Sequence, residues 1–469
     1  MHVRNILLSA AAYLALTLLL LGASPSLNAD GQEPVVSLDE VLQAAGGGPD
    51  ARLGQVTLSS AESQFAQAKA QNLFGLNGTA GGTRNAQFAS TAGNPLTTTP
   101  SIDTVEAGVQ LTAPLSTSIG VSGGPLIEET QPLHYGTNLS VTASSTLWDG
   151  YPGGKGRAAV KQAEITLRGA RVSDEANRKS IDYNVKQAYY TMLSTQRQLS
   201  VLQDTLAQRQ QELARIQAQF DLGNVTQIDL KQAKVNLRSA ELDLSTAQKS
   251  LSVERERLSA LVSWPLEKQY AVTEVPDMPM PTLDISQAIQ TALGQRAELR
   301  QFVLNRAAGE LNLTLKKSQI YPTVSANGRY SWDRDLTSNS NETNWSAGLQ
   351  VSVPILDSGL TSAQVRQARL QLESLQIQER KLAEGISTDV KNAIYNLQNL
   401  LAASELAAQN LDLANDQYEL AKTQYDSGVI TTLDLLTASV TLTTAQVNLA
   451  KSRSDVQLGV LALQNAMGE

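Results

Sequence analysis

Cysteine is absent from the sequence, and aromatic residues make up only 4% of it. Without cysteine the chain has no disulfide bond, no thiol nucleophile and no site for a lipid anchor on an N-terminal cysteine. Only two histidines are present, so a histidine–cysteine metal site within one chain is excluded. Few aromatics, with long stretches rich in Ala, Gln, Leu and Ser, favour thin helical layers over one thick core.

Charge of either sign is also modest, with a formal net charge of −8. No basic footprint of the kind that binds nucleic acid is visible, so we expect no nucleic-acid partner. The sequence shows no plausible pair of nucleophile and base and no metal-ligand cluster. We therefore expect neither catalysis nor a cofactor.

Long apolar runs are confined to the N-terminus. Residues 1–29 have a basic residue, Arg4, then an apolar core at Ile6–Leu21 and small residues, which is typical of a secretory signal peptide. An uncleaved anchor is the alternative, although the run is short for a span. No later segment approaches about 18 consecutive apolar residues, so a mature chain that enters a membrane must do so as a closed β-barrel.

Two very long helical patterns dominate the rest of the chain. Arg157–Leu222 and Thr361–Ser427 contain no proline, and at about 1.5 Å per residue each extends roughly 100 Å. Their apolar positions step by four and three, a repeat that indicates coiled-coil packing. Each is followed by a pattern about half as long, near Thr226–Val262 and Thr431–Met467.

The second half of the chain repeats the first at an offset of 205 residues. FDLGNVTQIDL, Phe220–Leu230, returns as YDSGVITTLDL, Tyr425–Leu435. The match indicates an internal duplication. A shorter helical pattern precedes the strands of each half, at Leu38–Asn72 and Leu283–Ser318, with Ser37 or Thr282 as a possible N-terminal cap.

The predicted organisation has four parts. They are the signal peptide at 1–29, a first repeat at 30–262 with its helical hairpin at 157–262, an equatorial linker at 263–281, and a second repeat at 282–469 with its hairpin at 360–467. Four prolines in the linker prevent helix continuation there.

Four segments alternate apolar and polar residues, within about 73–148 and about 320–356. They are Leu76–Arg84, Tyr135–Leu147, Val324–Trp332 and Trp345–Ile355. This pattern matches membrane barrel strands, with a soluble β-sandwich as the alternative. Because small barrels need about eight strands, one chain is insufficient and we expect oligomerisation. Residues 85–132 are interpreted as a long extracellular loop rather than an added hairpin.

Together these features resemble the TolC-type outer-membrane efflux protein family, the outer membrane factors of tripartite efflux and type I secretion systems. Family-like strings are LWDG at Leu147–Gly150, ILDSG at Ile355–Gly359 and LSALVSWPL at Leu258–Leu266. The resemblance implies a mainly α protein that is a homotrimer, with a 12-stranded membrane β-barrel, two strands from each half of each chain. This barrel would continue into a periplasmic α-helical coiled-coil barrel.

The resemblance also implies a passive exit duct in the outer membrane of a Gram-negative-type (diderm) bacterium, surrounded by outer-membrane lipid. Its substrates would come from an inner-membrane transporter of RND or ABC type through a periplasmic adaptor protein. An exit duct for type I protein secretion is the alternative. A structural or adhesive coiled-coil protein is a further one.

The paired turns are the predicted adaptor-binding tips. Glycine readily takes the left-handed conformation that ends a helix, and a threonine can cap the return helix. These roles explain the turns without a partner, while the resemblance adds adaptor docking. The tip residues are Gly223, Asn224, Val225, Thr226, Gly428, Val429, Ile430 and Thr431.

In resembling proteins, acidic residues just after the second tip ring the closed periplasmic aperture. Asp434 stands at such a position, and three-fold symmetry would bring three carboxylates together, which repel one another and attract cations. Alternatively, Asp434 serves only as a helix-start charge. Where resembling proteins have a second acidic residue, this chain has Thr437, and where they have a tip arginine, it has Ile430. Tyr425 and Asp229 match the residues of the family. We therefore expect a less tightly latched closed state.

Four aromatic residues lie at or near predicted strand ends, as in an aromatic girdle at a membrane interface. They are Trp148, Tyr151, Trp332 and Trp345. Ordinary packing between strand and helix is the alternative.

Overall fold

The computed structural model describes residues 34–469 except 74, 86–87, 90–96, 99–101, 114–116, 129–133, 224, 277 and 280–283. The predicted signal peptide at 1–29 lies outside the described residues. The chain divides into two compact units. The tip unit holds 184–279, 400–458 and the described part of 1–47, and the sheet unit holds 48–183, 280–399 and 459–469.

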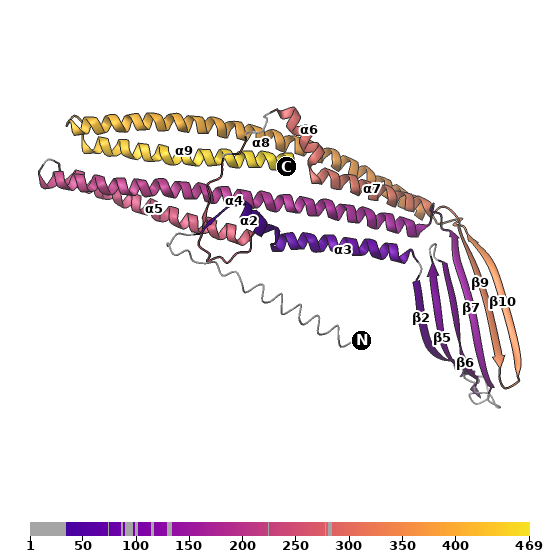
Figure 1. Ribbon diagram of the computed structural model, residues 1–469. Helices are drawn as coiled ribbons and strands as arrows, with labels where there is room; N and C mark the ends of the chain where they lie inside the picture. The colour runs from indigo at the N-terminus through magenta and orange to yellow at the C-terminus, as the bar shows by residue number, and fades with distance from the viewer. Residues whose placement is uncertain are drawn as a thin grey trace. The chain divides into compact units, whose positions relative to one another are not determined.

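Four long helices contain most of the helical residues that the structure describes (Figure 1). They are α4 (Lys155–Asp221), α5 (Gln227–Leu261), α8 (Leu360–Asp426) and α9 (Thr432–Met467). α4 and α8 are each 67 residues long, as the absence of proline and the internal duplication lead one to expect. Among the described residues, no helix is both long enough and apolar enough to cross a membrane.

An aspartate of the LWDG or ILDSG string accepts a backbone hydrogen bond at the start of each of the two longest helices. Oδ2 of Asp149 accepts a hydrogen bond from the backbone N–H of Lys155 at 2.5 Å, and Oδ2 of Asp357 accepts one from Thr361 at 2.8 Å. A carboxylate at a helix N-terminus satisfies otherwise unpaired N–H groups there. The recurrence of the strings therefore has a local structural cause.

The shorter helical pattern of each half forms two helices rather than one. These are α2 (Leu38–Gly46) and α3 (Pro49–Gln71) in the first half, and α6 (Ile285–Gln295) and α7 (Ala297–Ser318) in the second. The first break falls at Gly47-Gly48, and the second at Arg296, whose ψ of 122° is not helical. Ser37 caps α2 as predicted, but Asp284 is the cap of α6, because its carboxylate accepts from the N–H groups of Ser286 and Gln287.

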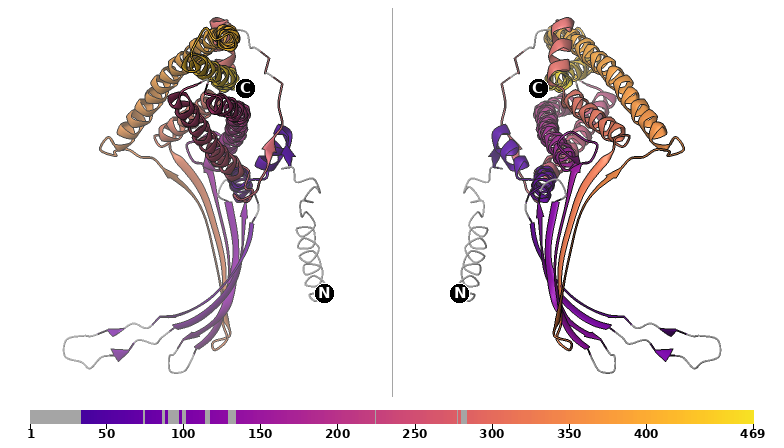
Figure 2. Two further views of the ribbon diagram at one scale, coloured as in Figure 1. Left: turned by 90° about the vertical axis from the view of Figure 1, so that its left-hand side faces the viewer. Right: turned by 90° about the vertical axis from the view of Figure 1, so that its right-hand side faces the viewer.

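Six strands form one antiparallel sheet in the sheet unit, in the order β10-β9-β7-β6-β5-β2. They are β2 (Gly75–Asn85), β5 (Ile102–Ala113), β6 (Thr117–Glu128), β7 (His134–Trp148), β9 (Thr323–Asp335) and β10 (Ser340–Ser352). The strands lie side by side in both figures (Figure 1, Figure 2). Two short pairs complete the described strands, β1 (Val35–Val36) with β8 (Ala271–Val272), and β3 (Phe88–Ala89) with β4 (Thr97–Thr98).

The interpretation of residues 85–132 as a loop is wrong, because β5 and β6 form a hairpin inside the sheet. β6 contains Gly120, Gly123, Gly124 and Pro125, residue types that are depleted in strands. They leave only a short alternation of apolar residues at Ile119 and Val121, so the pattern of this segment does not predict a strand. The first half thus contributes four strands to the sheet rather than the predicted two.

Candidate functional site: the two helical tips

The first tip is a tight turn between α4 and α5. Gly223 has a φ of +79°, which favours glycine, and its N–H donates to the carbonyl oxygen of Phe220 at 2.9 Å. Thr226 then caps α5, because its hydroxyl accepts from the N–H of Asp229 while the Asp229 carboxylate accepts from the Thr226 N–H at 2.9 Å. This reciprocal capping box needs no partner outside the turn.

The second tip reproduces the same hydrogen bonds between α8 and α9. Gly428 has a φ of +74° and donates to the carbonyl oxygen of Tyr425 at 2.9 Å. The Thr431 N–H donates to the Asp434 carboxylate at 3.0 Å, and the Asp434 N–H donates to the Thr431 hydroxyl. Hydrogen bonds from the hydroxyl and the backbone N–H of Thr431 lower the pKa of Asp434. The carboxylate is therefore ionised at neutral pH.

Each hairpin has its own small apolar core, beside the tip in the first hairpin and further along the helices in the second. In the first, Ile216 packs with Leu230 and Ala233, and in the second Ala414 packs with Leu442 and Ala445. Outside these cores four apolar side chains of the tips stay exposed. They are Leu222, Ile228, Val429 and Leu433, whose exposed fractions are 76%, 78%, 72% and 56%.

Polar contacts join the two hairpins just inside the tips. The Tyr425 hydroxyl of α8 donates to Oε1 of Gln219 on α4 at 2.5 Å. The guanidinium of Arg215 lies 5.4 Å from the centre of the Tyr425 ring and 4.0 Å from the Asp426 carboxylate. Tyr425 is therefore held by α4 of the same chain.

Further from the tips, a buried arginine of α4 forms an ion pair within its own helix and a hydrogen bond to α9. Nη1 of Arg209 donates to the Glu212 carboxylate at 2.8 Å and to the Ser439 hydroxyl at 2.6 Å. Arg209 and Glu212 are 4% and 5% exposed. Burying a charge costs free energy unless the charge is paired. The Glu212 carboxylate and the Ser439 hydroxyl offset this cost for Arg209, which is buried between the helices.

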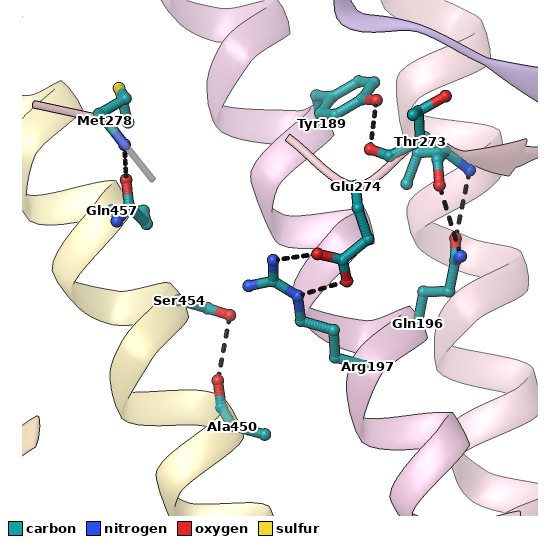
Figure 3. Close-up of polar contacts among 10 residues, drawn as sticks. Tyr189, Gln196, Arg197, Thr273, Glu274, Met278, Ala450, Ser454 and Gln457 are labelled. Carbon is teal, nitrogen blue, oxygen red and sulfur yellow. Dashed lines mark hydrogen bonds and ion pairs between the residues drawn. The ribbon is translucent and has the colours of Figure 1, made fainter. Parts of the chain in front are cut away.

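The linker at 263–281 is tied to the helices of the tip unit (Figure 3). Arg197 of α4 makes a two-pronged contact with Glu274, at 2.9 and 2.7 Å. The Tyr189 hydroxyl donates to the carbonyl oxygen of Thr273 at 2.8 Å, and the Met278 N–H donates to Oε1 of Gln457 on α9 at 2.8 Å. The described linker residues thus lie against both hairpins.

A family model for "Outer membrane efflux protein" matches residues 134–263 and 288–469. The chain belongs to the outer membrane efflux protein family. The matched ranges contain both tips and all four long helices. The resemblance to TolC-type proteins is therefore confirmed, and the family is one of outer-membrane efflux channels.

Named members of the efflux family are similar over most of their length. The outer membrane efflux protein BepC of Brucella suis biovar 1 is 25% identical over 339 residues, 70% of this chain and 72% of BepC. The outer membrane protein TolC of Vibrio cholerae is 23% identical over 317 residues, 66% of this chain and 72% of TolC. The crystal structure of VceC from Vibrio cholerae has a TM-score of 0.69 at 19% identity, covering 92% of this chain and 96% of VceC. At this identity the match to VceC shows the fold.

For this efflux-family chain the described tip residues fall into the two turns, and Asn224 lies outside the described residues. Asp229 and Tyr425 do not bond to each other within the chain, because Asp229 is engaged with Thr226 and Tyr425 with Gln219. Ile430 lies in the second turn, while the Thr437 hydroxyl donates to the carbonyl oxygen of Leu433 within α9.

The sequence reasoning missed Arg209, Glu212 and Arg215. Their equivalents at the 205-residue offset are Ala414, Gln417 and Leu420, which carry no charge. The charges occur in only one half of the duplication, and this difference between the halves could have drawn attention to the three residues.

The aromatic residues occupy different levels of the sheet. Trp148 ends β7 and Tyr151 follows it, while Trp332 lies three residues before the end of β9. Trp345 is not at a strand end, because β10 begins at Ser340 and Trp345 pairs with Tyr330 inside the sheet. Its side chain is 77% exposed in the single chain.

Proposed function

We propose that three copies of this chain form the outer-membrane exit duct of a tripartite efflux pump. The sheets of the three chains close a membrane β-barrel, and the long helices form a coiled-coil barrel in the periplasm. The duct passes substrates passively, after an inner-membrane transporter of RND or ABC type and a periplasmic adaptor deliver them. The bacterium is then of the diderm type, with outer-membrane lipid around the barrel.

The observation that carries this proposal is the pair of matched tips, each at the end of a 67-residue helix and each built by glycine and a capping box. Exposed apolar residues gather at both tips, and Ile228 and Leu433 are equivalent at the 205-residue offset. A surface of this kind favours binding of a partner protein. The adaptor is the partner that the proposed pump requires at this end.

We also propose that Asp434 lines the periplasmic aperture. Its carboxylate is exposed and ionised, and three copies near a three-fold axis would repel one another and attract cations. The bond of Tyr425 to Gln219 stays within one chain, and Ile430 supplies no charge. The absence of a charged residue at position 430 supports a closed state that is less stable than one held by a tip arginine.

The proposed division of the chain follows the same scheme. Residues 1–29 are a cleaved signal peptide, and the repeats at 30–262 and 282–469 are joined by the equatorial linker at 263–281. The contacts of Tyr189 and Arg197 with this linker support an equatorial position.

Fractionation of cells that express the full chain tests the proposal. The mature protein is expected in outer-membrane fractions as a trimer that converts to monomer on heating in detergent, and its loss is expected to raise sensitivity to pump substrates. A monomeric, water-soluble mature protein would falsify the proposal.

A further inference from the structure

The first half of the chain carries a strand pair that the second half lacks. In the described residues the second half contributes only β9 and β10 to the sheet, whereas the first contributes β2 and β7 with β5 and β6 between them. Two strands from each half would make four per chain. This chain has six.

The β5–β6 hairpin is bonded along both of its edges. β5 pairs with β2 from Gly75↔Thr112 to Asn85↔Ile102, which is the full length of β2. β6 pairs with β7 from Ser118↔Ser144 to Glu128↔His134. In a membrane every backbone N–H and C=O group must find a partner, and pairing on both edges supplies partners along most of this hairpin. The β5–β6 register itself is interrupted between Thr104↔Leu126 and Ala107↔Gly123, next to Pro125.

The hairpin also presents the same faces as its neighbours. One register row crosses the whole sheet through Gly78, Val109, Val121, Val141, Tyr330 and Trp345. All but the glycine are apolar or aromatic, and Val109 and Val121 are 50% and 43% exposed. The apolar face of β5 and β6 therefore continues the apolar face of β7, β9 and β10 without interruption.

The opposite face is polar across the same strands. The hydroxyls of Ser122 and Ser140 lie 2.9 Å apart, and those of Ser118 and Ser144 lie 2.8 Å apart, so β6 and β7 are joined by side-chain hydrogen bonds. Ser140 in turn pairs with Ser331 of β9. An apolar face and a polar face that both run through the hairpin are what a membrane barrel wall requires.

The β5–β6 hairpin is oriented as in a membrane barrel. β5 ends and β6 begins at the end of the sheet where β2 begins, because Thr112 pairs with Gly75 and with Ser118, and only three residues separate Ala113 from Thr117. At the other end, sixteen residues separate Asn85 from Ile102. Membrane barrels have short turns on the periplasmic side and longer loops outside. Because α3 leads into the start of β2, the ends of β5 and β6 that the short connection joins are those nearest α3.

The two edges of the sheet are complementary. Every neighbouring pair is antiparallel, so β2 and β10 at the edges of a six-stranded sheet run in opposite directions. Copies related by a rotation axis can therefore join β2 of one chain to β10 of the next and keep the antiparallel pattern. Such joining removes the unpaired edges.

We infer that β5 and β6 belong to the membrane wall, so that three chains close a barrel of three times six, or 18, strands instead of 12. The inference rests on the proposed trimeric duct. Barrel diameter grows roughly linearly with strand number, so the membrane opening is about 1.5 times wider than that of a 12-stranded barrel. Barrels of about 16–18 strands hold a water-filled channel, so the opening admits large hydrated solutes.

Disulfide cross-linking tests the inference cleanly, because the chain has no cysteine of its own. Ser122→Cys with Ser140→Cys probes β6 against β7, and Ser140→Cys with Ser331→Cys is the matched control across β7 and β9. After oxidation of native outer membranes, both pairs are expected to link within one chain. β7 has only two edges, so if β2 pairs with β7 directly, the control links and the Ser122–Ser140 pair does not. That result overturns the inference and leaves the proposed duct intact.

A second set of variants tests closure of the ring. Thr79→Cys on β2 is combined with a cysteine in place of Asn344, Ser346 or Gly348 on β10, and at least one combination is expected to give covalent dimers and trimers. If none links chains, β2 is not the edge that closes the barrel, and the inference fails. Absence of any trimer from the outer membrane overturns the proposed function together with the inference.

Electron cryomicroscopy of the trimer in lipid nanodiscs counts the strands directly. Eighteen strands support the inference, and twelve overturn it. Deletion of residues 102–128 supplies the reference, because it leaves β2 antiparallel to β7 and is expected to narrow the membrane barrel by about a third.

Discussion

The hydroxyl of Tyr189 donates a 2.8 Å hydrogen bond to the carbonyl oxygen of Thr273, which fastens the linker to α4 (Figure 3). Tyr189 is fully buried, and its burial raises its pKa to about 12 from an ordinary value of 10.0. The contact therefore links the stability of the tip unit to pH.

We expect Tyr189→Phe to lower the stability of the tip unit by about 1–3 kcal/mol, because the Thr273 carbonyl loses its donor. In the wild type, the raised pKa means that the stabilisation is complete below about pH 10 and is lost as the pH rises to about 12. Thermal melts followed by circular dichroism across this range should show a smaller alkaline loss in Tyr189→Phe. Tyr395→Phe, at a half-exposed position, is the control, and an unchanged alkaline loss in Tyr189→Phe would contradict the prediction.

Two glycines offer substitutions of opposite sign. Gly428→Ala should cost about 1–2 kcal/mol, because its φ of +74° is unfavourable for a residue with a Cβ. Gly385→Ala, in the interior of α8 with open space around the new Cβ, should stabilise by about 1 kcal/mol. Melting temperatures of the two variants are compared with the wild type. Equal shifts in one direction would show that backbone conformation does not control the second tip.

The buried ion pair is expected to show strong non-additivity. Arg209→Ala should destabilise the tip unit by about 3–5 kcal/mol, because Glu212 stays buried without its partner. Arg209→Met combined with Glu212→Leu should recover most of that loss. Denaturation curves of Arg209→Met, Glu212→Leu and the double variant complete a cycle that measures the coupling. A coupling energy near zero would mean that Glu212 does not compensate the buried charge of Arg209.

The proposed role of Asp434 in the aperture can be tested by comparing it with Asp229, which occupies the matching position in the first tip. Asp434→Asn and Asp229→Asn remove the same capping interactions, so their effects on stability should be similar. Only Asp434→Asn should weaken divalent-cation block of single channels, by about tenfold, because the proposed ring of carboxylates loses its charge. Ile430→Arg should lower the open probability. Identical conductance in Asp434→Asn and the wild type would remove Asp434 from the aperture.

Adaptor docking predicts a role for the exposed apolar residues of the tips. Ile228→Ser together with Leu433→Ser should weaken capture of the cognate adaptor from membranes by at least about tenfold, because each buried apolar side chain contributes about 1.5–3 kcal/mol. Leu242→Ser, at an exposed position on α5 away from the turn, serves as the comparison. Full adaptor capture by the double variant would argue against docking at these residues.

Local interactions explain what could be read from the chain alone. The ends of α4 and α8, the positive φ of Gly223 and Gly428, and the caps by Thr226 and Ser37 all depend on residues a few positions apart. The repeat at 205 residues likewise predicted two helices of equal length. Such features follow from propensity, capping and helical periodicity, which are properties of short stretches.

Contacts between distant segments could be decided only by the tertiary structure. Gln219 rather than Asp229 receives the Tyr425 hydrogen bond, and Ser439 meets Arg209 across 230 positions of the chain. The glycines and proline of β6 make it a poor strand in isolation, yet pairing with β5 and β7 supplies its hydrogen bonds. The sequence by itself therefore determined the helices and their turns, whereas strand pairing across the fold decided the width of the sheet.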